Sequence, residues 1–198
     1  MLSEINQYLA TIQTICPELN EQTLGSFREG LTVLTLRKKD FYIQTGDLQK
    51  KAGFVVKGLI RAFYSDPSGN EKTVYFIPEN EYAFHYASFV THKPSPLSFQ
   101  CLEETTIVQF SPEQLKKAYE QIPKFETYGR LIVEEKLRLQ QERLEGFLFG
   151  SSEQRYLDFV SQYSQLFNRI TLTDLCSYLG VERQTLTRIR KKLQAHKF

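Results

Sequence analysis

Tryptophan is absent from this chain of 198 residues, and there are only 3 cysteines, 7 prolines and 10 glycines. The cysteines lie far apart and form no CxxC pair, so we expect neither a disulfide framework nor a clustered thiolate metal site. No stretch approaches the roughly 18 consecutive apolar residues of a membrane-spanning helix, and residues 1–11 lack the basic start and apolar run of a signal peptide. These absences predict a cytoplasmic protein with no membrane partner.

Composition and charge are those of an ordinary globular protein. Hydrophobic residues make up 41% of the chain and charged residues 24%, which suffices for one large or two modest domains. Residues 170–198 hold six Lys or Arg against two acidic residues, a net charge of +4; because the whole chain carries +2, the remainder carries −2. A basic terminus on a mildly acidic body is typical of a short nucleic-acid-binding module attached to a domain with another purpose.

Short apolar runs separated by turn signals fill the sequence between residues 31 and 110. The turns include Gly46-Asp47, Lys57-Gly58 and Pro67-Ser68-Gly69, where Pro presets φ and Gly supplies positive φ. Runs this short, with no helix of about ten residues or more between them, predict an antiparallel barrel or jelly roll rather than a parallel sheet. The expected strands are Leu31–Leu36, Phe54–Ile60, Thr73–Ile77, Leu97–Leu102 and Thr106–Phe110.

Helices are predicted on both sides of this β region. Leu2–Ile15 has apolar residues at three- and four-residue spacing, and Phe125–Phe149 reads as one long helix without proline. Two apolar stripes can be traced along the long helix, so one stripe would cover the β domain and the other would contact a second copy of the chain. The alternative is a single broad apolar face that packs only within the chain. The stripes are Tyr128, Ile132 and Leu139, and Leu137, Leu144 and Leu148. We name Tyr128, Ile132 and Leu139 as the dimer-helix residues, although the pattern alone does not decide between the stripes.

The most specific pattern lies in residues 171–193. Thr171 and Asp174 match a capping box, and the apolar face that follows them ends at Gly180, whose missing Cβ suits a tight turn. A second helix begins near Arg183, so the segment predicts a helix-turn-helix. The glycines and serines of Gly146–Ser152 make that segment the expected hinge in front of it.

The second of these helices has two opposed faces. Leu186, Ile189 and Leu193 form a buried stripe, and a second set with the same spacing lies about 200° around the axis. Arg can bridge O6 and N7 of guanine, Gln can bridge N6 and N7 of adenine, and Thr can meet a thymine methyl, so this second set suits the major groove. A merely solvated face is the alternative, but the capping box, the glycine turn and the local charge favour DNA. The outward set is Gln184, Thr187, Arg188 and Lys191.

The run Ile170–Leu193 resembles the helix-turn-helix of the Crp/Fnr family of bacterial transcription regulators, and Gly46-Asp47 with Phe54–Tyr64 resembles that family's cyclic-nucleotide-binding-type β domain. The resemblance implies an α+β fold with an effector domain (1–122), a long dimerisation helix and hinge (123–149), and a helix-turn-helix domain (150–198). It implies a homodimer on palindromic double-stranded DNA, RNA polymerase as a further partner, and no enzymatic activity. We assign base contacts to Arg183, Gln184, Thr187 and Arg188, and phosphate contacts to Thr171, Thr173, Arg190, Lys191, Lys192 and Lys197.

The effector domain departs from the family's cyclic-nucleotide site, which uses a Gly-Glu pair and an Arg beside a small residue. This chain has no Arg between Arg61 and Arg130 and no Gly between Gly69 and Gly129. A lone carboxylate at Glu81 would repel a cyclic phosphate, so we do not expect cAMP to bind in the usual way. The window is aromatic instead, and it either packs itself shut or accepts a small apolar or aromatic effector of unknown identity. The pocket residues that we name are Tyr75, Glu81, Tyr82, Phe84 and Tyr86.

No cofactor is expected, and two other functions remain as alternatives. The chain has no cysteine cluster for an iron–sulfur centre, and the isolated His85 and His92 argue against haem and against the His-rich metal site of a cupin-like enzyme. The alternatives are that cupin-like metalloenzyme and a nucleotide-sensing module whose helix-turn-helix contacts proteins. Two departures concern DNA binding: Glu182 stands where the family usually has an N-capping Ser, and the sequence ends at Phe198, before a β-hairpin wing.

Overall fold

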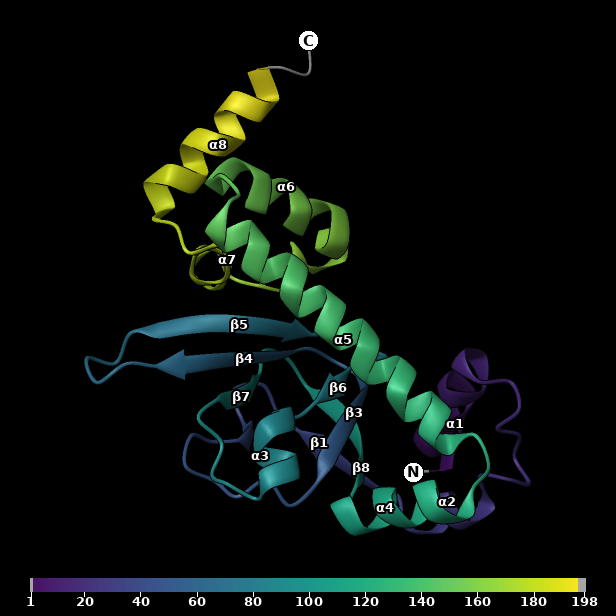
Figure 1. Ribbon diagram of the computed structural model, residues 1–198. Coiled ribbons are helices and arrows are strands. Elements are labelled where there is room, and N and C mark those ends of the chain that lie inside the picture. The colour runs from purple at the N-terminus through teal and green to yellow at the C-terminus, as the bar shows by residue number, and fades with distance from the viewer. Residues whose placement is uncertain (1, 196–198) are drawn as a thin grey trace.

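The computed structural model describes residues 2–195, and it has a β-rich body and a helical unit joined by one long helix (Figure 1). The body begins with α1 (Leu2–Ile15), which has the bounds predicted from its periodicity. Its apolar side, which includes Ile5, Leu9 and Ile12, is buried against the body, because residues three and four apart share one face of a helix. A short α2 (Gly25–Glu29) follows.

Two four-stranded antiparallel sheets form the centre of the body. One has the order β1–β8–β3–β6 and the other the order β2–β7–β4–β5, with apolar residues such as Val55 and Phe99 buried between them. The antiparallel β domain of an α+β fold is confirmed, but the sheets are not closed into a barrel. The strands are β1 (Thr32–Leu36), β2 (Phe41–Ile43), β3 (Ala52–Lys57), β4 (Ile60–Ser65), β5 (Glu71–Ile77), β6 (Tyr82–Ala83), β7 (Ser98–Cys101) and β8 (Thr105–Phe110).

The single strand expected over Phe54–Ile60 is wrong, because the chain turns at the Lys57-Gly58 signal and passes from one sheet to the other. Gly58 has a φ of 103°, and a Cβ on it would lie 2.6 Å from the main-chain oxygen of Glu104. Only glycine fits both that conformation and that space. The residues on both sides of the turn are apolar because both strands are buried, so the run looked continuous in the sequence.

Several short elements of the body were not predicted from the sequence. They are α2, β2, β6, α3 (Tyr86–Thr91) and α4 (Pro112–Gln121). α4 begins at a capping box in which the Ser111 hydroxyl accepts from the Gln114 N–H, with Pro112 in the first turn. That start signal was present in the sequence, whereas β6 has only two residues and no periodicity to recognise.

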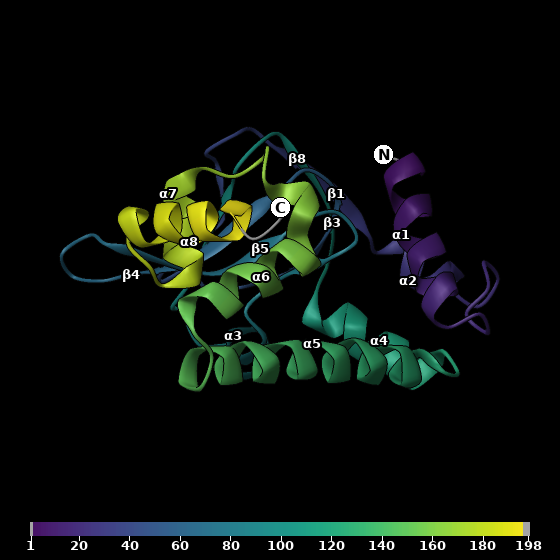
Figure 2. The same ribbon diagram turned by 90° about the horizontal axis from the view of Figure 1, so that it is seen from above.

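The long helix α5 (Phe125–Leu148) runs along one side of the body, which is clearest from above (Figure 2). Tyr128 is buried and Ile132 packs against the same apolar cluster as α1, while Leu139 lines a cleft on this inward side. Tyr128 and Ile132 therefore face their own chain, a position that does not favour them for the predicted dimer seam, whereas Leu139 is half-buried and lines the same cleft as Leu137. The stripe left exposed on α5 consists of Leu137, Leu144 and Leu148.

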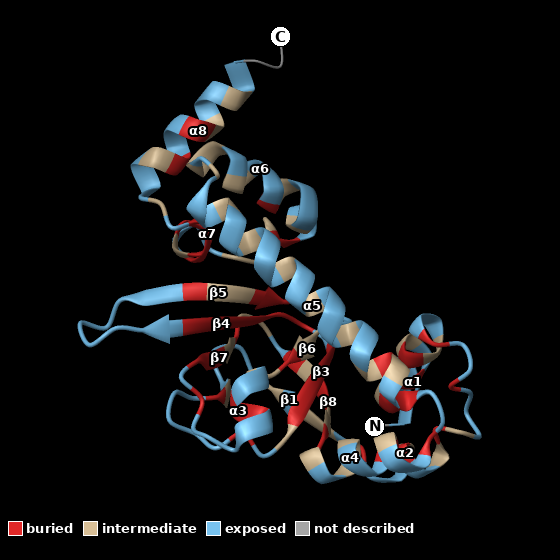
Figure 3. Cartoon of the chain, viewed as in Figure 1, coloured by how far each residue is buried: buried red, intermediate tan, exposed pale blue. Residues whose placement is uncertain are grey.

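The helical unit consists of α6 (Ser152–Tyr163), the 3-10 turn η1 (Ser164–Leu166), α7 (Leu172–Leu179) and α8 (Arg183–Ala195). Buried positions lie on the sides of these helices that face one another (Figure 3). Leu175, Leu179 and Leu186 share one apolar cluster with Leu59 and Phe76 of the body, so the helical unit packs directly on the sheet. Among residues 2–195, no helix combines the length and the hydropathy that crossing a bilayer requires.

Candidate nucleic-acid interface and sensor cleft

α7 and α8 are joined by a tight turn, and local contacts define both ends of α7. The Asp174 N–H donates to the Thr171 hydroxyl at 3.1 Å, and the Thr171 N–H donates to the Asp174 carboxylate at 3.3 Å, which completes the predicted capping box. The Thr171 hydroxyl also donates to that carboxylate at 2.7 Å. The helix ends at Gly180, with φ 65° and ψ 41°, and a Cβ there would lie 2.9 Å from the Phe147 ring. The left-handed glycine is thus required both by the turn and by the close approach of Phe147.

α8 has the two faces that its sequence predicted. Leu186 and Ile189 are buried, with exposed fractions of 0% and 7%, and they pack toward the other helices of the unit. α8 itself lies at the outer end of the molecule, away from the β-rich body (Figure 1). All four outward residues are exposed: Gln184, Thr187, Arg188 and Lys191.

The structure also places the other residues predicted to contact DNA. Thr171, Thr173 and Arg183 are exposed near the turn, and the Arg183 guanidinium donates to the Thr173 hydroxyl at 2.5 Å. A residue assigned to bases and one assigned to phosphates are therefore adjacent. Lys192 is exposed farther along α8, and its ammonium group lies 2.6 Å from the Glu153 carboxylate at the start of α6.

Arg190 is placed differently from the other basic residues of α8. Its Nε atom is buried and has no hydrogen-bond partner among the described residues, and its guanidinium lies over the rings of Tyr156 and Phe167, at 5.6 and 5.8 Å from their centroids. Because this side chain packs inside the helical unit, its position does not favour the predicted phosphate contact. Lys197 lies outside the described residues.

A cleft of about 1160 Å³ lies between the sheet, α5 and α6. The five predicted pocket residues all line it, and the inward side of α5 supplies the facing wall through residues such as Ile132 and Leu139. The cleft is therefore bounded by both parts of the molecule, and it is not the space between the two sheets, which is filled by its own apolar residues. We call it the sensor cleft.

Polar groups within the sensor cleft are largely engaged with one another. Glu81 forms an ion pair with Lys136 of α5, and the Tyr75 hydroxyl accepts from the Gln140 amide at 2.9 Å. The Tyr82 hydroxyl is hydrogen-bonded to those of Tyr8, at 3.0 Å, and Tyr128. Burial raises the pKa of Tyr82 well above its usual value, so this linked group stays protonated.

The two histidines considered as haem or metal ligands lie at opposite ends of α3. His85 is the N-cap: its Nδ1 accepts from the Ser88 N–H at 3.3 Å, and burial lowers the pKa of its ring. His92 ends the same helix with a φ of 56°. In residues 2–195 no group of three His, Cys, Asp or Glu side chains is arranged to hold a metal ion.

Three arginines that no sequence pattern singled out connect the body to the helical unit. Arg169 precedes α7, and its guanidinium nitrogens lie 2.8 and 2.9 Å from the Glu79 carboxylate and 2.6 Å from that of Glu103. Arg143 of α5 and Arg61 of β4 make further contacts across the same boundary. Of these contacts, only the one made by Arg61 had a signal in the sequence. Arg61 is a charged residue in the middle of an apolar strand, and a buried charge requires a partner.

Comparison with known proteins agrees with this architecture. Residues 33–122 match the cyclic nucleotide-binding domain family. A search of curated protein sequences gave no match. Among solved structures, FixK2 from Bradyrhizobium japonicum is similar with a TM-score of 0.69 and 15% identity, over 84% of this chain and 86% of that one.

Two further solved structures have the same arrangement. A CooA mutant from Carboxydothermus hydrogenoformans has a TM-score of 0.70 and 16% identity, over 87% of this chain and 79% of its own. The c-di-GMP-responsive global regulator CLP from Xanthomonas campestris has a TM-score of 0.68 and 15% identity, over 90% of this chain and 93% of its own. Residues 33–122 are thus similar to the cyclic nucleotide-binding domain family, and the chain as a whole has the fold of these solved structures.

Proposed function

We propose that this protein is a homodimeric transcription regulator that binds palindromic double-stranded DNA in the cytoplasm through the outer face of α8. The observation that carries the proposal is the division of α8 into a buried side and an exposed side that holds Gln184, Thr187, Arg188 and Lys191. Arg and Gln are the residues that make two-bond contacts with guanine and adenine in the major groove. Arg183, Thr171, Thr173 and Lys192 lie around this face, where they would contact phosphates or neighbouring bases.

The dimer would form through the exposed stripe of α5. Leu137, Leu144 and Leu148 are 55%, 58% and 64% exposed, and two of them lie seven residues apart, as in a coiled-coil seam. Pairing two copies of α5 along this stripe leaves the opposite side of each helix on its own body. The pair would carry two copies of α8, which suits two half-sites about one DNA turn apart.

The sensor cleft is the candidate effector site of this regulator. Its aromatic wall contains Tyr75, Tyr82 and Phe84, and Glu81 is already paired with Lys136. A cleft of this size with an aromatic wall and a compensated carboxylate suits a small, uncharged molecule with an apolar or aromatic part better than a cyclic phosphate. Binding between the sheet and α5 would act on the helix that carries the dimer seam.

Selection from a random pool of duplexes tests the proposal. The purified protein should enrich a palindromic sequence, and light scattering should find two chains on each bound duplex. Affinity for that duplex should fall steeply as salt rises, because phosphate contacts release counterions. Enrichment of no motif, or binding that does not respond to salt, would contradict DNA recognition and favour a module that contacts proteins.

A further inference from the structure

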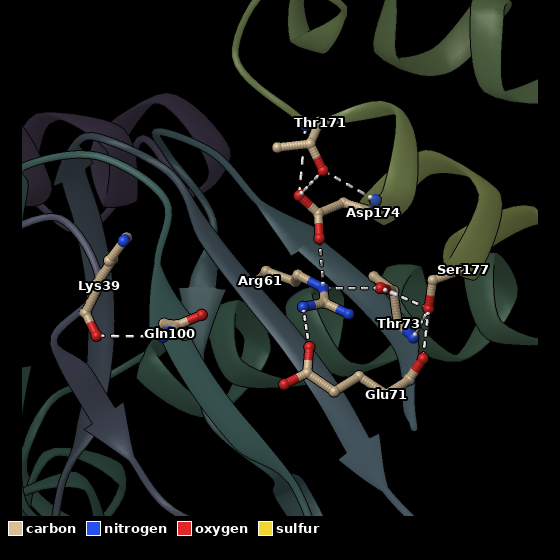
Figure 4. Close-up of polar contacts among 8 residues, drawn as sticks. All are labelled: Lys39, Arg61, Glu71, Thr73, Gln100, Thr171, Asp174 and Ser177. Atoms are coloured by element: carbon tan, nitrogen blue, oxygen red, sulfur yellow. Dashed lines mark hydrogen bonds and ion pairs between the residues drawn. The ribbon is translucent and has the colours of Figure 1, made fainter. Parts of the chain in front are cut away.

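A buried arginine joins the β-rich body to the first helix of the helix-turn-helix. The Arg61 side chain on β4 is 6% exposed, and it lies between two carboxylates (Figure 4). Its Nη1 is 2.5 Å from Glu71 of the neighbouring strand β5, and its Nε is 3.3 Å from Asp174 of α7. The same Nε donates to the Thr73 hydroxyl at 2.8 Å. One cation therefore connects two strands of the body to the helical unit.

The next turn of α7 makes a second set of contacts with the same strands. The Ser177 hydroxyl accepts from the Thr73 N–H at 2.9 Å and from the Thr73 hydroxyl at 3.1 Å, and it donates to the Glu71 carbonyl at 2.8 Å (Figure 4). Asp174 and Ser177 are three residues apart, so they share one face of α7. We call Arg61, Glu71, Thr73, Asp174 and Ser177 the docking cluster.

Each oxygen of the Asp174 carboxylate has a separate role. Oδ2 accepts from the Thr171 hydroxyl and main-chain N–H and so completes the cap of α7, whereas Oδ1 faces Arg61. Because Asp174 is only 8% exposed, its charge needs partners on both sides. The start of α7 is thus connected directly to β4.

Apolar contacts hold the two parts together but do not fix their rotation. Phe76 of β5 packs on Tyr178 of α7 with ring centroids 5.2 Å apart, and Leu59 joins the same cluster. Such contacts are non-directional, whereas hydrogen bonds require defined angles. Two polar contact points, one turn apart along α7, therefore contribute to how this helix is oriented on the sheet, together with Arg143 and Arg169.

The dimer helix is part of the same junction. The Arg143 guanidinium of α5 donates to the Tyr178 carbonyl at 2.9 Å and to the Thr73 carbonyl at 3.3 Å, and it stacks on the Tyr178 ring at 3.7 Å. α5, β5 and α7 therefore meet at Thr73 and Tyr178. The angle between the helix that would pair two chains and the helix that precedes the recognition helix is set at this point.

We propose that Arg61 is a positioning residue for DNA recognition, which fixes the separation and relative rotation of the two recognition helices in the dimer. This inference rests on the proposed function. The docked α7 leaves the outer face of α8 exposed, so docking is compatible with DNA binding and does not mask it. The docking cluster would make the dimer selective for one half-site spacing, although none of its residues belongs to the exposed face of α8.

Half-site spacing is the readout that a merely structural role would not move. The palindrome selected by the wild-type protein is synthesised with its natural spacing and with one or two base pairs inserted or deleted. Each base pair changes the rotation between half-sites by about 35° and their separation by about 3.4 Å. Binding is measured for the wild type, Arg61→Met and Ser177→Ala, with Lys116→Met and Ser68→Ala as controls at exposed positions outside the cluster.

The wild type and both controls should lose about 10²-fold in affinity when the spacing is wrong, because the two half-sites can no longer be bound together. The affinity of Arg61→Met and of Ser177→Ala should fall only about tenfold or less when the spacing is wrong, and their preference among half-site sequences should not change. Ser177→Ala removes one hydroxyl without stranding a charge, so it tests the proposal even where Arg61→Met fails to fold.

An unchanged ratio between correct and wrong spacing in Ser177→Ala overturns the positioning role, whatever the absolute affinity. A rise in affinity at the same ratio would show instead that docking inhibits DNA binding, and it also overturns the proposal. If the wild type selects no palindrome, the proposed function itself fails. If the wild type selects a palindrome and the variants have the same spacing dependence as the wild type, only the positioning role fails.

Discussion

Replacing Leu186 by Ala should lower the free energy of unfolding of the helical unit by about 3 kcal/mol, within the range of about 2–5 kcal/mol for buried Leu→Ala changes. Leu186 is 0% exposed and belongs to an apolar cluster with Phe159, Leu166 and Leu175. These neighbours come from three different elements packed against one another, so the cavity can close only in part. We therefore take a value near the middle of the range rather than the transfer free energy alone.

The neighbouring residue supplies the control. Thr187 is exposed, and its hydroxyl donates only to the Arg183 carbonyl one turn back. Thr187→Ala should change the free energy of unfolding by no more than about 0.5 kcal/mol. Urea unfolding followed by circular dichroism measures both variants. Equal stability losses in the two, or a loss below about 1 kcal/mol for Leu186→Ala, would refute the assignment of the two faces of α8.

Three further outcomes follow from the structure. The double variant Leu137→Glu/Leu144→Glu should be a monomer in light scattering. Its affinity for the palindrome should fall about 10²-fold, but its affinity for a single half-site should not change. A stable dimer would place the seam elsewhere. Added cAMP should leave the melting temperature unchanged, because a ligand stabilises only the fold that it binds; a concentration-dependent rise would contradict this. Burial raises the pKa of Glu79, but the hydrogen bonds and charge of Arg169, together with main-chain N–H groups that include that of Gly58, hold this pKa below its usual 4.5. These contacts therefore stabilise the fold above pH 4.5 and less as pH falls through the lowered pKa, and Arg169→Gln should reduce that acid-side loss in unfolding titrations.

Local rules predicted the parts of the fold that depend on local geometry. The periodicity of Leu2–Ile15 gave α1 with its bounds, and Thr171, Asp174 and Gly180 gave α7 with both of its ends. An amphipathic face suffices for α1, and α7 has capping residues as well, because each helix is specified by neighbours within four residues.

The sequence was least informative where the partner of a residue lies far away along the chain. Both stripes of α5 are apolar, and only the packing of Tyr128 against Tyr82 shows which one faces the body. Arg190 has the charge of a phosphate ligand, but the rings of Tyr156 and Phe167 lie beneath it. Periodicity gives the direction of a side chain on its helix and not what stands opposite it.

The same distinction between local patterns and long-range packing applies to the candidate site. The exposed face of α8 could be predicted, because it requires only that the opposite side be buried. The docking cluster could not, since Arg61 and Asp174 are brought together by the packing of two domains. The sensor cleft is intermediate: its aromatic residues were named from one segment, but the wall that α5 supplies was not.

The most direct test of base reading by α8 compares the sequences that the wild type and Arg188→Ala select from the same random pool of duplexes. The wild type should select a palindrome. The variant should select the same palindrome with the preference lost at one base pair in each half, at a cost of about 1–3 kcal/mol per contact. An identical motif for both proteins would show that the outer face of α8 does not read DNA.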